Sequence, residues 1–125
     1  MIKEWKKKSS KYLLENKIFK LREDIVESPK LETEHKVWAM EVPTWVNIIP
    51  ITSLGEVILV NQYRFGMEKF SLEIPGGMSD IGEDPMLAAT RELKEETGYV
   101  VKKVLEIGRV ESNPEIMSNH TSTYL

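Results

Sequence analysis

The chain has 125 residues, of which 17 are lysine or arginine and 20 are aspartate or glutamate, and it contains no cysteine. This length predicts one compact domain, or a small core with an appendage. The lack of cysteine excludes disulfides, thiolate metal ligands and cysteine nucleophiles, and we expect a cytoplasmic protein. No apolar run reaches the roughly 18 residues that a membrane span needs, so we expect no membrane partner.

Charge is distributed unevenly along the chain. Residues 1–20 carry seven lysines and two glutamates, a net charge of +5, whereas the remaining residues carry a net charge of −8. The basic segment is compatible with binding to RNA or to a membrane surface, but such a run is more often a solvated terminal helix. The acidic remainder argues against nucleic acid as the main substrate.

The order of apolar and turn-forming residues predicts strands on both sides of one helix. A short helix is expected over residues 1–16, followed by a small antiparallel sheet. The predicted strands occupy residues 17–26, 35–42, 45–51, 56–64, 70–74, 100–109 and 121–125. This arrangement implies a mixed sheet and a fold of the α/β or α+β class. We divide the chain into an N-terminal region, residues 1–46, and a core, residues 47–125.

The predicted helix runs from Pro85 to Thr97. Asp84 is a good N-cap, and Pro85 suits the first helical position because its missing N–H costs nothing there. Gly98 suits the left-handed residue that ends many helices. These signals define both ends of the helix.

Glu92, Glu95 and Glu96 stand at positions i, i+3 and i+4 of this helix and therefore share one face. Arg91 lies one turn before Glu95 and can hold its carboxylate. A hard cation relieves the repulsion between clustered carboxylates, and Mg²⁺ favours a few carboxylates together with phosphate oxygens. The alternative is a solvated charged face, which is common.

Paired glycines, Gly76 and Gly77, precede the helix and permit close backbone approach. Taken alone they indicate a simple turn. Combined with the acidic helix, they form a loop that can direct the carbonyl of Gly76 toward a metal.

The spacing between Gly77 and Tyr99 resembles a known signature: G, five residues, E, seven residues, R-E-aliphatic, one residue, E-E, one residue, G-hydrophobic. Every fixed position of the Nudix hydrolase signature is met. The fixed positions are Gly77, Glu83, Arg91, Glu92, Glu95, Glu96 and Gly98. The resemblance implies the Nudix fold, a mixed β-sheet with the signature helix, here with an added N-terminal antiparallel sheet.

Further segments are similar to the ADP-ribose pyrophosphatase branch of that superfamily. They are residues 45–50, 60–66, 72–77 and 113–117. The resemblance implies hydrolysis of ADP-ribose, or of a related nucleoside diphosphate sugar, to AMP and a sugar phosphate. Water would attack phosphorus within a cluster of Mg²⁺ ions, with Mn²⁺ as an alternative metal.

The same resemblance assigns roles to individual residues. Arg91, Glu92, Glu95 and Glu96 form the implied catalytic set, in which Arg91 orients Glu95. The implied metal ligands are the carbonyl of Gly76 and the carboxylates of Glu83, Glu92, Glu95 and Glu96, although Glu83 would alternatively support its loop.

Substrate contacts are implied for Arg64, Glu73 and Trp45. A guanidinium fork suits the phosphate oxygens of a diphosphate, but a strand arginine is more often part of a surface ion pair. Glu73 would accept a hydrogen bond from ribose or adenine. Trp45 offers a flat face for adenine stacking and is equally compatible with a core position. His120 is interpreted as a polar loop residue.

The branch implies a homodimer, in which residues 17–46 pair with a second subunit and Arg22 contacts substrate across the interface. It also implies additional strand, loop and helix after Leu125, so we expect the core to be C-terminally incomplete. Two other functions remain open. One is a non-catalytic module that senses a nucleotide diphosphate, and the other is an RNA 5′-pyrophosphohydrolase that uses the basic N-terminus.

Overall fold

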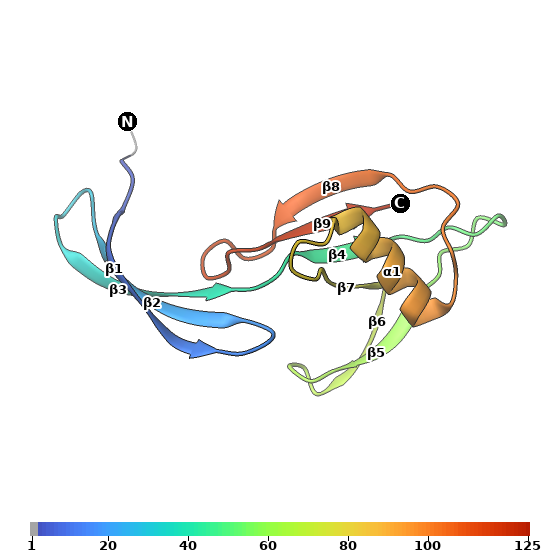
Figure 1. The fold of residues 1–125 in the computed structure, drawn as a ribbon, viewed down its shortest axis with the longest axis horizontal. Helices are drawn as coiled ribbons and strands as arrows, with labels where there is room; N and C mark the ends of the chain where they lie inside the picture. Colours follow the sequence, from blue (N-terminus) through green and yellow to red (C-terminus); the bar gives the residue numbers. More distant parts are fainter. Residues whose placement is uncertain (1–2) are drawn as a thin grey trace. The chain divides into compact units, whose positions relative to one another are not determined.

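The structure, a computed structural model, describes residues 3–125 (Figure 1). It consists of two compact units. The N-terminal unit comprises Met1–Val42 and Glu111–Asn119, and the core unit comprises Pro43–Val110 and His120–Leu125.

The N-terminal unit is an antiparallel sheet of three strands in the order β1-β2-β3. The strands are β1 (Lys6–Glu15), β2 (Lys20–Glu27) and β3 (Glu34–Glu41). The two strands predicted over residues 17–26 and 35–42 are thereby confirmed, with small shifts of their ends. The last part of this unit, Glu111–Asn119, meets β3 through a bridge between Met40 and Met117.

The helix predicted over residues 1–16 is wrong. Residues 6–15 form strand β1, and residues 1–2 lie outside the described part of the chain. The physical reason is pairing with β2: Lys8 forms an ion pair with Glu27, and Glu15 lies 2.6 Å from Lys20 across the hairpin. Opposite charges facing each other across two strands stabilise a sheet, and a local sequence pattern does not reveal that partner.

The core unit is built on a mixed sheet with the strand order β7-β4-β9-β8. The strands are β4 (Trp45–Ile48), β7 (Gly76–Met78), β8 (Glu106–Glu111) and β9 (His120–Tyr124). Strand β4 runs parallel to β9 and antiparallel to β7. The predicted mixed sheet is therefore confirmed, although two predicted strands differ in extent, as described next.

Strand β4 ends at Ile48 instead of continuing to residue 51, and β8 occupies only the end of the predicted 100–109 segment and extends beyond it. Pro50 has no N–H to donate to a neighbouring strand, which explains the early end of β4. Strand β7 contains the paired glycines that were predicted to form a loop.

Helix α1 (Pro85–Thr97) covers one face of this sheet and packs on β4 and β7 (Figure 1). The hydrophobic core consists of six buried residues: Val46, Ile48, Ala88, Ala89, Leu93 and Tyr124. Each fully buried large apolar side chain stabilises the fold by about 1.5–3 kcal/mol. Ala88 and Ala89 lie on the buried face of α1, and their small side chains permit close approach of the helix to the sheet.

A separate hairpin, β5 (Val60–Arg64) and β6 (Lys69–Glu73), belongs to the same unit. The strand predicted from residue 56 starts later, at Val60, and Val57 forms only an isolated bridge with Ile51. The turn of the hairpin contains Glu68 with a φ of 53°.

Candidate active site

Helix α1 begins and ends at the residues predicted from the sequence. The Asp84 carboxylate accepts hydrogen bonds from the backbone N–H groups of Met86, at 2.9 Å, and Leu87, at 3.3 Å. Gly98 has a φ of 76°, and its N–H donates to the carbonyl of Lys94 at 2.9 Å. These caps satisfy backbone groups that have no partner inside the helix, and they fix the helix that carries the acidic residues.

Arg91 links the helix to the loop before it. Its Nε and Nη2 donate to the two oxygens of Glu83 at 3.0 and 2.9 Å, and Nη2 also donates to the carbonyl of Met78 at 3.2 Å. Its Nη1 donates to Glu92 at 2.8 Å and to Glu95 at 3.3 Å. The predicted contact with Glu95 is thus the longest of several, and Arg91 chiefly fixes Glu83 and Glu92.

These contacts shift two pKa values. The hydrogen bonds from Arg91, followed by one from the backbone N–H of Asp80, lower the pKa of Glu83 from 4.5 to about 2. The hydrogen bonds with Glu83 raise the pKa of Arg91. Both groups are therefore charged over the whole physiological range, and Glu83 cannot serve as a general acid there.

Glu92 lies directly against the backbone of Gly77. A Cβ atom built on Gly77 would be 2.4 Å from Cδ of Glu92, and one built on Gly76 would be 2.3 Å from the carbonyl oxygen of Val46. Position 76 therefore requires glycine, since a larger side chain would displace the backbone of strand β4, and a side chain at position 77 would displace the Glu92 carboxylate. The glycine pair lies inside strand β7 and not in a turn, and it permits close approach of Glu92 and of strand β4.

Glu96 is held by two donors from outside the helix. The backbone N–H of Gly76 donates to one carboxylate oxygen at 3.2 Å, and the side-chain amide of Gln62 donates to the other. No role was predicted for Gln62 from the sequence. Its position two residues before Arg64 on one strand was the available signal, because alternate residues of a strand share a face.

The acidic residues offer suitable ligands for a divalent cation. Within residues 3–125 no three histidine, aspartate or glutamate side chains converge as a ready-made metal site. Glu92 and Glu96 nevertheless both lie against the glycine pair, with side chains bonded to Arg91 and Gln62. Carboxylate and carbonyl oxygens are hard donors of the kind that Mg²⁺ and Mn²⁺ prefer, so the residue types here fit such a cation.

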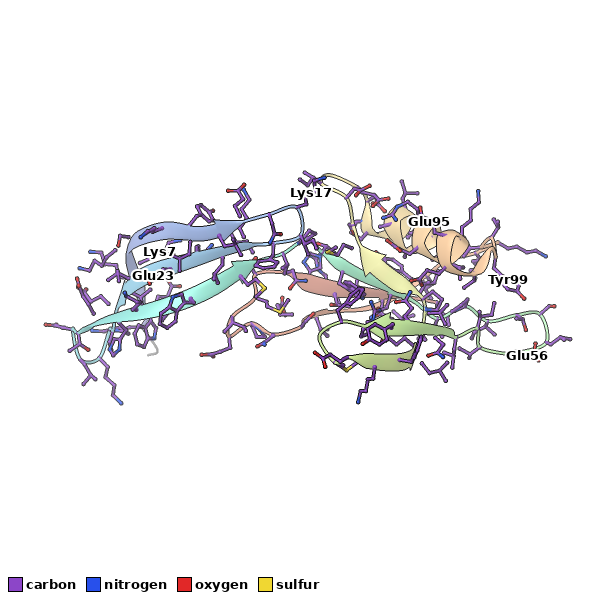
Figure 2. All side chains as sticks on the ribbon, turned by 90° about the horizontal axis from the view of Figure 1, so that it is seen from below. Lys7, Lys17, Glu23, Glu56, Glu95 and Tyr99 are labelled. Carbon is purple, nitrogen blue, oxygen red and sulfur yellow. The ribbon has the colours of Figure 1, made fainter. Side chains whose placement is uncertain are left out.

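Glu95 differs from its neighbours in exposure. Its side chain is 59% exposed, whereas that of Glu92 is 15% exposed. Figure 2 shows Glu95 on the outer side of α1. Glu95 is therefore free to turn toward a bound group, while Glu92 is fixed by its surroundings.

Three predicted substrate-binding residues lie together on the core unit. Arg64 bonds to Glu73 with Nε at 3.0 Å from one carboxylate oxygen, and its guanidinium carbon lies 5.6 Å from the centre of the Trp45 ring. The indole N–H of Trp45 donates to Asn47 at 2.8 Å. Trp45 is partly exposed and not a core residue, so its ring remains accessible for stacking.

Arg22 lies in the N-terminal unit. Its Nε donates to Asp24 at 2.9 Å, and it also bonds to Glu41, which accepts a hydrogen bond from Tyr12 at 3.1 Å. The arginine is thus occupied by carboxylates of its own sheet. His120, predicted to be a loop residue, begins β9, where its Nδ1 accepts a hydrogen bond from Arg109 at 2.9 Å.

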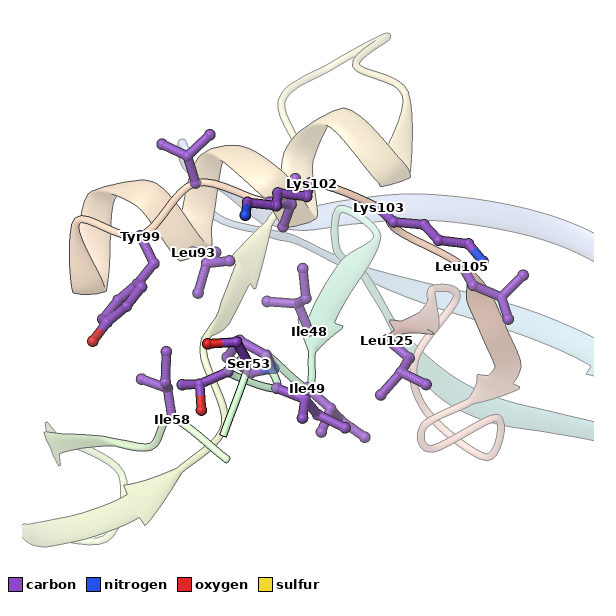
Figure 3. A pocket seen from close by; sticks show the side chains of 15 residues that line it. Ile48, Ile49, Ser53, Ile58, Leu93, Tyr99, Lys102, Lys103, Leu105 and Leu125 are labelled. Atoms are coloured by element: carbon purple, nitrogen blue, oxygen red, sulfur yellow. The ribbon is translucent and has the colours of Figure 1, made fainter. Parts of the chain in front are cut away.

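A pocket of about 660 Å³ occupies another part of the core unit (Figure 3). Mostly apolar side chains line it, including Ile48, Ile58 and Leu93 together with Tyr99 and Leu125. No predicted site residue is part of this lining, and we assign the pocket no role in the acidic site.

Two families of known proteins match parts of this chain. Residues 43–123 match the family described as NUDIX domain. Residues 5–30 match the family described as nucleoside diphosphate sugar hydrolase N-terminal domain. No helix in residues 3–125 has the length and apolar character needed to cross a membrane.

Two curated relatives share about two fifths of the aligned residues. The methanol dehydrogenase activator of Bacillus methanolicus is 40% identical over 87 residues, which are 70% of this chain and 46% of that protein. The ADP-ribose pyrophosphatase of Bacillus subtilis is 40% identical over 72 residues, which are 58% of this chain and 39% of that protein. The chain thus spans less than half the length of either relative.

A solved structure establishes the fold. The crystal structure of an ADP compounds hydrolase superposes with a TM-score of 0.87 and 23% identity, covering 99% of this chain and 67% of that one. The match to the NUDIX family covers more than half of the chain and contains all of α1. The chain therefore belongs to the NUDIX domain family.

Proposed function

We propose that this chain hydrolyses the diphosphate bond of ADP-ribose, or of a related nucleoside diphosphate sugar, to AMP and a sugar phosphate. One observation carries the proposal: Glu92 and Glu96 of α1 are both placed against the paired glycines of β7. The names of similar proteins support the substrate class, since they include an ADP-ribose pyrophosphatase and an ADP-sugar pyrophosphatase from Mus musculus, the latter 56% identical over 43 residues.

Glu92, Glu96 and the carbonyl of Gly76 would hold Mg²⁺, or Mn²⁺ in its place, and Glu95 and Glu83 would complete its surroundings. When bound, the cation neutralises charge on the diphosphate and lowers the pKa of a bound water. Arg91 keeps Glu92 and Glu83 in place through its hydrogen bonds. Glu95 would reach the same region, and its exposed side chain and long hydrogen bond with Arg91 support this role.

In the reaction, a water oxygen forms a bond to phosphorus while the bond from phosphorus to the bridging oxygen breaks. The bridging oxygen leaves with one product phosphate, and the proton of the water passes to solvent or to a neighbouring carboxylate. Arg64 would contact the diphosphate, and to do so its guanidinium must share its donors between Glu73 and phosphate oxygens. Trp45 would stack on adenine, and Glu73 would accept a hydrogen bond from ribose or adenine.

The partners of the chain are also part of this proposal. We expect a cytoplasmic homodimer in which residues 17–46 pair with a second subunit and Arg22 contacts substrate of the partner. We expect no nucleic-acid substrate. Several basic side chains of the N-terminal sheet are already paired with acidic ones, as Lys8 is with Glu27 and Lys36 with Glu23, which reduces their attraction for RNA.

The direct test is to incubate the 125-residue chain with ADP-ribose, once with Mg²⁺ and once with EDTA, and to measure the released AMP by chromatography. We expect AMP with Mg²⁺ and none with EDTA. Calorimetric binding of ADP-ribose without any AMP would favour the nucleotide-sensing alternative over hydrolysis. Release that is equally fast in EDTA would contradict the role given to the metal.

A further inference from the structure

In the hairpin β5–β6, three polar side chains are partly buried, and two aromatic side chains are exposed. Gln62, Arg64 and Glu73 are partly buried, whereas Tyr63 is 46% exposed and Phe70 is 67% exposed. Hairpins that cover an apolar core have the opposite arrangement. Arg64 and Glu73 of this partly buried face bond to each other, and Gln62 donates a hydrogen bond to Glu96 of α1.

Gln62 and Gly76 give each oxygen of Glu96 one donor. The amide of Gln62 bonds to Oε1, and the N–H of Gly76 bonds to Oε2 at 3.2 Å. Each carboxylate oxygen has further lone pairs, so both bonds leave Glu96 able to bind a cation. The amide of Gln62 is neutral, so it adds no positive charge beside Glu96, whereas Arg91 places a positive charge beside Glu92.

The same face of β5 carries Arg64, the predicted diphosphate contact. Gln62 and Arg64 are two residues apart on one strand and so point to the same side. The hydrogen bonds with Glu73 raise the pKa of Arg64, and the negative charge of Glu96 contributes to the shift. One strand thus carries Arg64, which would bind the substrate, and Gln62, which bonds to the expected metal ligand Glu96.

We propose that Gln62 is a positioning residue for the hydrolysis, holding Glu96 in place for the divalent cation and keeping the β5–β6 hairpin, with Arg64, against α1. This inference rests on the proposed function, because it assigns Gln62 a role within that site. Residues that hold metal ligands in place typically contribute 10- to 100-fold to metal affinity or activity.

The test compares two substitutions in which an amide is replaced by an apolar side chain of similar size. Gln62→Met removes the donor to Glu96, and Asn61→Leu makes the matched change on the neighbouring residue, which lies on the exposed face of the same strand. Mn²⁺ affinity is measured by calorimetry on the 125-residue chain, alongside kcat and KM for ADP-ribose. A thermal unfolding curve of each protein without metal reports any general loss of structure.

We expect Gln62→Met to weaken Mn²⁺ binding by about 10- to 100-fold and to lower kcat by a similar factor. Asn61→Leu should change neither. Gln62→Glu retains the length of the side chain but replaces the donor by a second carboxylate, and it serves if Gln62→Met does not fold. We expect the metal-free melting temperature of Gln62→Glu to fall through repulsion from Glu96, and Mn²⁺ to restore part of the loss.

Wild-type affinity for Mn²⁺ in both Gln62 variants would overturn the inference, as would an equal loss in Asn61→Leu. Absence of Mn²⁺ binding by the wild-type chain would also overturn it, since Glu96 would then have no cation to hold. Failure of the proposed function looks different: the wild-type chain would bind Mn²⁺ in a Gln62-dependent manner and yet release no AMP from ADP-ribose.

Discussion

Arg91 contacts three carboxylates and one backbone carbonyl. This single side chain connects Met78 and Glu83, which precede α1, to the middle of the helix. Its geometry explains why the spacing between Glu83 and Arg91 matters physically: the loop closes back on the helix through two parallel N–H bonds. Bidentate bonds of this kind are stronger and more directional than single ones.

The first prediction concerns the acid stability that this pair provides. The pKa of Glu83 is lowered from 4.5 to about 2, so its contribution to the free energy of unfolding is complete above pH 4.5 and is lost as the pH falls toward 2. We expect Glu83→Gln to be less stable than wild type at neutral pH. The difference should shrink between pH 4.5 and pH 2.

Urea unfolding at a series of pH values measures this effect, with Glu68→Gln as a control because Glu68 is exposed in the hairpin turn. A constant difference between Glu83→Gln and wild type from pH 7 to pH 2 would show that the ion pair does not supply the stability.

Individual residues differ in how far their roles could be predicted. Arg91 and Glu83 are eight residues apart and both are fixed positions of the signature, so the motif identifies both residues. Gln62 and Glu96 are 34 positions apart, and Asn47 interacts with Trp45 only because both occupy one face of a strand. The contact of Gln62 with Glu96 depends on how separate elements pack, and the contact of Asn47 with Trp45 depends on the strand that holds both, so neither could be assigned before the elements were known.

Helix α1 shows how local signals determine an element. Asp84, Pro85 and Gly98 each act within one turn of the helix end, so its bounds followed from the sequence. Strand β1 shows the opposite case, because it exists through pairing with β2 and its own residues are exposed. Strand β7 was missed since glycines ordinarily weaken strands and here serve the close approach of Glu92.

The second prediction is that Asp84→Ala destabilises the chain by about 0.5–2 kcal/mol, the usual cost of losing an N-cap. The carboxylate accepts from two backbone N–H groups that would lose their partner. Asp84→Asn keeps an acceptor oxygen and should be close to wild type. Chemical denaturation measures the three proteins, and equal stability of Asp84→Ala and wild type would show that the cap contributes nothing.

The two units of the molecule differ in how much they bury. The core unit encloses the buried cluster beneath α1, whereas the N-terminal sheet leaves large side chains exposed, among them Trp5 at 54%, Tyr12 at 52% and Trp38 at 52%. A sheet with two exposed faces is marginally stable by itself. The mixed sheet could be predicted from the order of strands and helix, but the exposure of each face of the N-terminal sheet could not.

The third prediction follows from this exposure and from the proposed homodimer. We expect sedimentation equilibrium to show a dimer at micromolar concentration, and we expect Trp38→Glu to shift the equilibrium toward monomer because it replaces an exposed aromatic side chain of β3 by a charge. Leu54→Glu is the control, since Leu54 is 83% exposed in a loop of the core unit. A monomer at every concentration would contradict the proposed pairing.

The measurement that bears most directly on the whole account is the rate of AMP release from ADP-ribose by Glu96→Gln, compared with wild type at saturating Mg²⁺. Glutamine keeps the size of the side chain and removes the charge that would bind the cation. We predict a fall of about 10²- to 10³-fold, the scale of losing a principal electrostatic contribution to catalysis, with an unchanged melting temperature. Turnover equal to wild type would show that the acidic face of α1 is not the site of hydrolysis.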